Sequence, residues 1–62
     1  MNVYIIVCGY NHEGYSVPKA AFFNEDNARE YIVNNENNFK YCDYVDVIKL
    51  EIGNPEKYPE IL

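Results

Sequence analysis

The stretch Asn2–Tyr10, NVYIIVCGY, decides the fold of this chain. It has no charged residue and is rich in Val, Ile and Tyr, which fit a pleated, half-buried strand. With a period of two, one face carries the β-branched side chains of Val3, Ile5 and Val7. The other face carries the side chains of Tyr4, Ile6, Cys8 and Tyr10. Because both faces are apolar, we expect a central strand with neighbours on both edges and cover on both sides.

The next segments predict a hairpin partner for this strand. Asn11–Tyr15 is polar and contains a glycine, which is typical of a hairpin loop. Ser16–Phe23 then reads as a second strand. Pro18 lacks an N–H and Lys19 adds a charge, and both features favour a position at the edge of the sheet.

A capped helix follows the second strand. Asn24 is a good N-cap residue, and Glu25 and Asp26 place negative charge in the first turn, where the helix dipole favours it. We expect the helix to run from Glu25 to Asn34 or Asn35. Its apolar stripe is narrow and consists of Ala28, Tyr31 and Ile32, with Asn35 next on the same face.

Tyr44–Ile52 predicts the last strand, and Gly53-Asn54-Pro55 ends it. The order β-β-α-β, with a right-handed crossover, predicts a three-stranded, mainly antiparallel sheet of order 2-1-3 with one helix on one face. The fold class is α+β. Residues 1–53 form a single domain, and 54–62 form a C-terminal tail that either folds back or stays loose.

One helix covers only one face of the central strand. We assign the face of Val3, Ile5 and Val7 to the helix, because compact side chains allow its close approach. The uncovered apolar face predicts an interaction surface. Its candidate partner-binding residues are Tyr4, Ile6, Cys8 and Tyr10.

Composition narrows the class of function. The chain has 62 residues and a net charge of −5, which opposes binding to nucleic acid or to an anionic membrane. The acidity indicates either ordinary solubility, which we favour, or a basic partner. A domain this small is marginally stable without a metal, disulfides or a second copy.

The sequence shows no targeting signal, and its two cysteines form no recognisable motif. Both observations predict a cytoplasmic protein. We see no signal peptide at the N-terminus and no run of apolar residues long enough to span a bilayer. Cys8 and Cys42 are 34 positions apart and belong to no CxxC pair. In a reducing cytosol we expect both to be buried thiols, with a disulfide or a shared metal as the less favoured alternative.

No constellation of residues predicts an enzyme. His12 beside Glu13 suits a ligand or a base, yet nothing completes a site, so a solvated histidine is favoured. Asp43 and Asp46 are three apart and would point to opposite faces of a strand. We expect no catalytic residue, no metal and no cofactor.

Two surfaces have functional interpretations. Glu25, Asp26 and Glu30 form an acidic helix face that suits mimicry of nucleic-acid phosphates, although a solvated helix face is favoured. The seven tyrosines suit either an aromatic ligand platform or a protein interface, and we prefer the interface.

The opening VYIIV, the segment AFFNEDNAREYI and the closing YVDVIKLEI together resemble a loose group of small, mostly uncharacterised β-β-α-β proteins of bacteria and their phages. The resemblance covers residues 2–52 and implies a fold and a phage or mobile-element origin. It implies no active site.

These observations predict a non-enzymatic protein-interaction module, for example a phage-encoded modulator or inhibitor of a host protein. It would act through the apolar face together with Glu25, Asp26 and Glu30. The alternative is a homodimeric module that binds a small ligand at the dimer seam.

Overall fold

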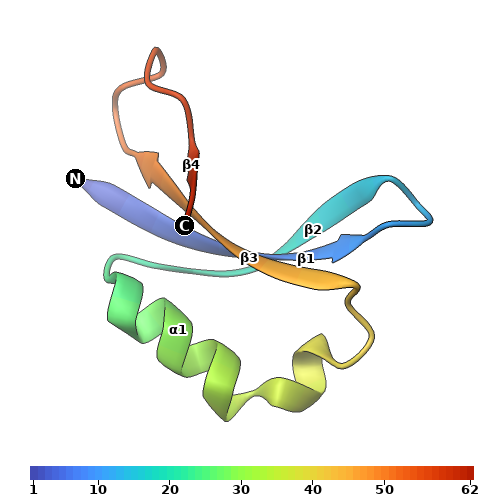
Figure 1. Cartoon of the computed structure of the whole chain (residues 1–62). Helices are drawn as coiled ribbons and strands as arrows, with labels where there is room; N and C mark the ends of the chain where they lie inside the picture. The colour runs from blue at the N-terminus through green and yellow to red at the C-terminus, as the bar shows by residue number, and fades with distance from the viewer.

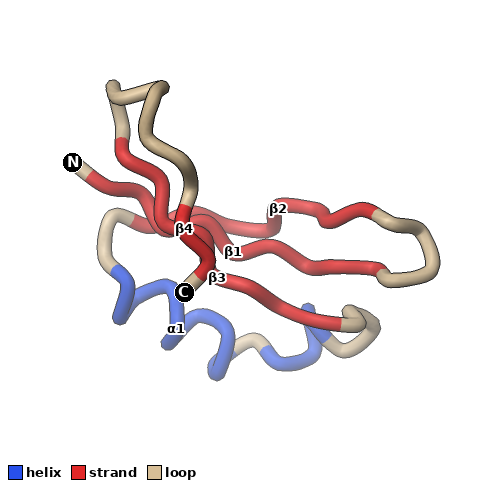
Figure 2. The backbone as a smooth tube through the Cα atoms, turned by 45° about the horizontal axis from the view of Figure 1, so that its top comes forward, coloured by secondary structure: helices blue, strands red, loops and turns tan.

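The computed structural model describes residues 1–62 and consists of a twisted sheet with one helical layer (Figures 1 and 2). The sheet has the strand order β2-β1-β3-β4, and every neighbouring pair is antiparallel. The α+β class and the arrangement of the first three strands are therefore as predicted. The elements are β1 (Asn2–Tyr10), β2 (Tyr15–Phe22), α1 (Glu25–Asn34), the 3₁₀ helix η1 (Glu36–Phe39), β3 (Tyr44–Glu51) and β4 (Glu60–Ile61).

β1 is the central strand, as its uncharged sequence predicts. It pairs with β2 from Tyr4 to Tyr10 and with β3 from Asn2 to Gly9. The β1–β2 turn contains Gly14 at φ +71°, in the left-handed region that favours glycine. Both long edges of β1 are therefore occupied along most of its length.

β2 is an edge strand, and a β-bulge interrupts its pairing with β1. Ile6 pairs with Ala20 and Val7 pairs with Pro18, so Lys19 is the extra residue. The bulge lies beside the proline, where a ladder hydrogen bond is already lost. This irregularity makes the free edge of β2 a poor template for another strand.

α1 begins and ends where side chains satisfy its free backbone groups. The Asn24 Oδ1 accepts from the N–H of Asp26 at 2.8 Å and from that of Asn27 at 3.3 Å. At the other end, the Asn35 side chain donates to the Tyr31 carbonyl at 2.9 Å. The predicted cap and boundaries are confirmed.

The helix covers the face of β1 opposite to the predicted one. Ile6 is fully buried and packs with Ala28 of α1, Phe39 of η1 and Val47 of β3. Tyr4 packs against the same cluster. The assignment of the Val3 face to the helix is therefore wrong.

The physical reason lies in connectivity rather than in side-chain size. The β2–α1–β3 connection crosses β1 in the right-handed sense (Figures 1 and 2). Within a strand, the hairpin register decides which side chains point to each side of the sheet. Since both faces of β1 are apolar, its composition could not choose between them.

The C-terminal tail folds back onto β3 and adds a fourth strand. Ile61 lies opposite Ile48, and the Leu62 N–H donates to the Val47 carbonyl at 2.9 Å. The predicted count of three strands is corrected to four. β3 is consequently an inner strand where β4 lies beside it, whereas the predicted order 2-1-3 placed the third strand at an edge of the sheet.

The orientation of β1 can be tested by truncating two adjacent isoleucines. Ile6→Ala should lower the free energy of unfolding by about 2–5 kcal/mol, because it opens a cavity beneath α1. Ile5→Ala, on the opposite face, should cost roughly half as much or less, since part of that side chain already contacts water. Urea unfolding at low protein concentration measures both values, and the reverse order would contradict the orientation.

Candidate functional site

The face of the sheet turned away from α1 is apolar and has no layer over it (Figure 1). We call it the open face. Directly paired residues of neighbouring strands point to the same side, so the residues that pair with Val3, Ile5 and Val7 belong to it. Gly9 has the same parity along β1, so its partners belong to this face as well. The members are Val3, Ile5, Val7 and Gly9 of β1, Ser16, Pro18 and Ala21 of β2, Tyr44, Asp46, Ile48 and Leu50 of β3, and Ile61 of β4.

The open face is exposed at both edges of the sheet, where Pro18 and Ala21 of β2 and Ile61 of β4 lie. Ile61 is 68% exposed, and Ile48 and Leu50 beside it are partly exposed. Val7, near the middle of β1, is only 6% exposed. Asp46 is the single charged member of the open face. The face therefore combines a wide apolar area with almost no charge.

Tyr44 extends the open face over the end of β1. Gly9 lies opposite Tyr44, and the Tyr44 ring occupies the space that a Cβ on Gly9 would fill. Gly9 is consequently required there for packing and not for its backbone angles. The ring itself remains 41% exposed. An aromatic side chain that packs across a strand glycine stabilises the pairing and adds apolar surface.

The predicted partner-binding residues of β1 lie on the helix side. Ile6 and Cys8 are both 0% exposed, so neither is available to a partner. Tyr4 packs against the core, and the Tyr10 ring lies 5.7 Å from that of Tyr15 near the hairpin turn. The predicted assignment of these side chains to the open face is therefore wrong, because α1 covers their side of β1. The β1 residues that do belong to the open face, Val3, Ile5 and Val7, were the ones assigned to the helix.

The acidic residues of α1 lie on the opposite layer from the open face. The Glu25 carboxylate accepts from the Arg29 Nε at 2.9 Å, which offsets its charge. Asp26 and Glu30 are exposed and four positions apart, so they share a side of the helix. The structure therefore separates the predicted acidic surface from the apolar one.

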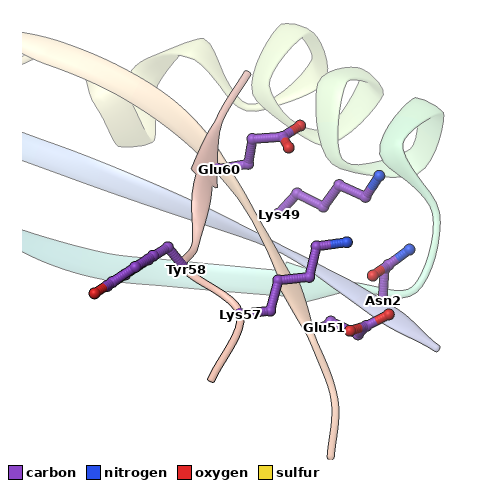
Figure 3. A pocket seen from close by; sticks show the side chains of 6 residues that line it. All are labelled: Asn2, Lys49, Glu51, Lys57, Tyr58 and Glu60. Atoms are coloured by element: carbon purple, nitrogen blue, oxygen red, sulfur yellow. The ribbon is translucent and has the colours of Figure 1, made fainter. Parts of the chain in front are cut away.

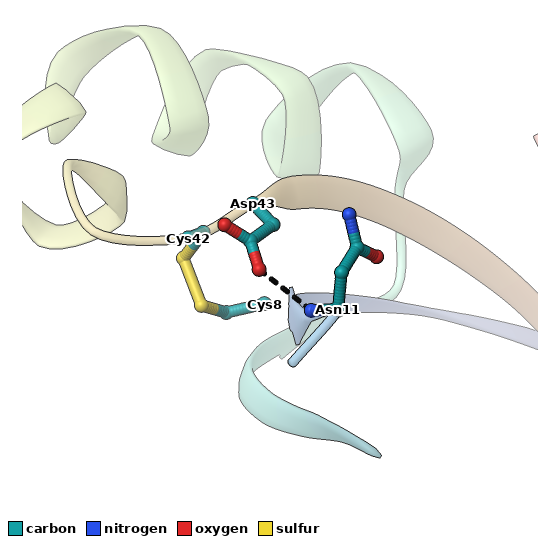
Figure 4. The surroundings of a disulfide bond; sticks show 4 residues. All are labelled: Cys8, Asn11, Cys42 and Asp43. Atoms are coloured by element: carbon teal, nitrogen blue, oxygen red, sulfur yellow. Dashed lines mark hydrogen bonds between the residues drawn. A yellow bond between two sulfur atoms is a disulfide. The ribbon is translucent and has the colours of Figure 1, made fainter. Parts of the chain in front are cut away.

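Cys8 and Cys42 form a disulfide that attaches the segment before β3 to the central strand (Figure 4). The expectation of two free thiols is wrong. Spacing carries no signal for this pairing, because the two residues meet only after the helix has crossed the sheet. Two hydrogen bonds of Asp43 reinforce the attachment. Its N–H donates to the Gly9 carbonyl at 2.8 Å, and its carboxylate accepts from the Asn11 N–H at 2.6 Å.

A shallow polar hollow lies between the end of β3 and the loop that leads to β4 (Figure 3). Two lysines and two glutamates balance each other's charge there, and the Glu51 carboxylate also accepts from the Asn54 side chain at 2.6 Å. This balance gives the hollow no preference for an anion or a cation. It is lined by Asn2, Lys49, Glu51, Lys57, Tyr58 and Glu60.

No other group of side chains forms a site. His12 is exposed in the hairpin turn, and the Asp43 carboxylate is engaged in the hydrogen bond to Asn11. No three His, Cys, Asp or Glu side chains gather as metal ligands would. No helix is long and apolar enough to cross a bilayer.

Comparison with models of protein families, with curated proteins and with solved structures finds no match. The function therefore has to be argued from the residues of this chain.

Opening the disulfide should destabilise the domain strongly. It bridges residues 34 positions apart, and a cross-link of this span lowers the entropy of the unfolded chain by an amount worth about 3–4 kcal/mol. Urea unfolding with and without a reductant measures the difference. The double variant Cys8→Ala/Cys42→Ala is the control and should not respond to the reductant. If the reductant changed the stability of the wild type and of the double variant equally, the Cys8–Cys42 disulfide would be contradicted.

Proposed function

We propose that the chain is a small, non-enzymatic protein-interaction module that acts through the open face. The observation that carries this proposal is the apolar sheet face, which has one charged member and no covering layer. Contiguous apolar surface of this kind is uncommon on a monomer that has no partner, because its exposure to water is unfavourable. Proteins bury such surfaces against one another.

The proposed binding residues differ from those that the sequence indicated. Ile48, Leu50 and Ile61 replace Ile6 and Cys8 as the central contacts, since Ile61 is exposed and Ile48 and Leu50 are partly exposed, whereas Ile6 and Cys8 are buried. Tyr44 supplies an aromatic side chain at the end of the face, where tyrosine is favoured at interfaces. Asp26 and Glu30 lie on the other layer and would engage only a partner that reaches around the molecule, such as a basic host protein.

A phage-encoded modulator of a host protein is the specific form that we propose for the module. The small size fits a protein that works by occupying a surface. The disulfide opposes the cytoplasmic location that the sequence indicates, because such bonds seldom persist in a reducing compartment. We therefore propose that the module acts where the bond can persist.

The oxidation state of the isolated protein tests this location. Alkylation at the moment of cell lysis should leave Cys8 and Cys42 unmodified if the bond exists in the cell. Mass spectrometry then distinguishes the oxidised chain from one that carries two alkyl groups. Complete alkylation would restore the cytoplasmic interpretation and show that the bond is open there.

The proposed use of the open face is tested with variants of a single chain. Ile48→Lys places a charge on the open face, and Val33→Lys makes the same change at a side chain on α1 that is 68% exposed. A host protein that binds the purified chain in calorimetry should lose at least about tenfold in affinity to Ile48→Lys and retain it with Val33→Lys. Joint reversal of Asp26 and Glu30 should leave binding intact. Loss of binding in that variant alone would support acidic mimicry instead.

A further inference from the structure

We infer that β3 binds an extended peptide segment of another protein, which pairs antiparallel with its outer edge and displaces β4. The inference goes beyond the proposed use of the open face, because backbone groups at the edge of the sheet make the contact. Strand addition of this kind obtains affinity from main-chain hydrogen bonds and specificity from alternate side chains.

The β3 edge, by which we mean the side of Tyr44–Glu51 turned away from β1, is only partly covered. β4 pairs with two of the eight residues of β3 (Figure 1). The Leu62 N–H adds a hydrogen bond to the Val47 carbonyl. Backbone groups alternate in direction along a strand, so Val45 turns its N–H and C=O to the same edge as Val47. No strand lies beside Val45 on that edge. The edge therefore offers a free donor and a free acceptor next to those that the tail uses.

The C-terminal tail shows what the β3 edge accepts and is itself weakly held. It is an extended segment that pairs antiparallel with β3. Every residue from Ile52 to Leu62 is exposed, so the return of the tail buries little apolar surface. Segments with few buried apolar contacts open at a small cost in free energy. A strand that follows the whole β3 edge, about 26 Å long, would form more ladder hydrogen bonds than the tail does.

The opposite edge of the sheet is less suited to strand addition. Pro18 and the bulge at Lys19 interrupt β2, as described above. β3 contains no proline, and its register with β1 is continuous from Tyr44 to Glu51. An incoming strand would therefore find a regular ladder only at the β3 edge.

The side chains of the tail already match those of β3. Glu60 lies opposite Lys49, and Ile61 lies opposite Ile48. Residues that lie directly opposite each other in an antiparallel pair stabilise it when they carry opposite charges or are both apolar. The tail thus gives the first part of a preferred sequence, which is an acidic residue followed by apolar ones.

The next three residues of β3 extend this preferred sequence. Asp46 forms no ion pair, so a basic residue opposite it would be favoured. Val45 packs against the core and favours an apolar residue opposite it. Tyr44, which is 41% exposed, favours an aromatic one. We therefore expect a partner segment with the pattern acidic, apolar, apolar, basic, apolar, aromatic.

The peptide Glu-Ile-Leu-Lys-Val-Tyr with blocked ends, added to the full chain at up to about 1 mM, tests the inference. Hydrogen exchange of single amides is measured by NMR. The Val45 amide should exchange at least about tenfold more slowly when the peptide is bound. The Asp46 amide, which points toward β1, should be protected with and without the peptide. Absence of binding, or binding that leaves exchange at Val45 unchanged, would overturn the inference.

Two methylated peptides separate backbone pairing from side-chain contact. Methylation of the leucine nitrogen removes the N–H that would bond to Val47, and it should weaken binding by at least about tenfold. Methylation of the isoleucine nitrogen, whose N–H would point away from β3, should change the affinity by no more than about twofold. Equal losses for the two peptides would contradict strand addition.

The displacement of β4 is tested with two variants of the tail. Leu62→Pro removes the N–H that bonds to the Val47 carbonyl, and Leu62→Ala retains it. Because the tail and the peptide compete for one edge, Leu62→Pro should bind the peptide at least about threefold more tightly than Leu62→Ala. Equal affinities would show that the peptide does not take the place of the tail.

Discussion

The central strand has two apolar faces, and the single short helix of this chain can cover only one of them. The rest of the structure depends on this constraint. β1 lies in the middle of the sheet and carries apolar side chains on both sides. α1 has only 10 residues and covers one side. The burial of Ile6 against Ala28 therefore forms the core, while Ile5 and its neighbours are left on the other side. The open face exists because no second helix or sheet covers the other side of β1.

The segment between α1 and β3 is the second support of the fold. A lone turn of 3₁₀ helix would contribute little, yet Phe39 at its end is 8% exposed and belongs to the core. The disulfide and the Asp43 hydrogen bonds hold this segment on β1. In a chain with so few buried residues, such cross-links compensate for apolar burial that a larger domain would supply.

The fold places the acidic face of α1 and the apolar open face on different sides of the molecule. The negative charges belong to α1, which lies on one side of the sheet (Figure 2), and the residues that pair with Val3, Ile5 and Val7 face the other side. A surface that is both acidic and apolar is consequently absent from either layer. In the proposed interaction module, recognition at the open face would be governed by shape and desolvation, and the acidic residues of α1 would lie outside the contact.

The sequence by itself determined β1, β2, α1 and β3 and their order. The cap at Asn24, the edge features at Pro18 and the uncharged run of β1 each depend on nearby residues, and such local preferences can be read along a chain. The sequence also predicted an uncovered apolar face, because both faces of the central strand are apolar and one helix can cover only one of them. Only the tertiary structure decided which face it is, because handedness and register act on the whole sheet. The pairing of Cys8 with Cys42 and the return of the tail as β4 were likewise decided in three dimensions, since both join segments that lie far apart in the sequence.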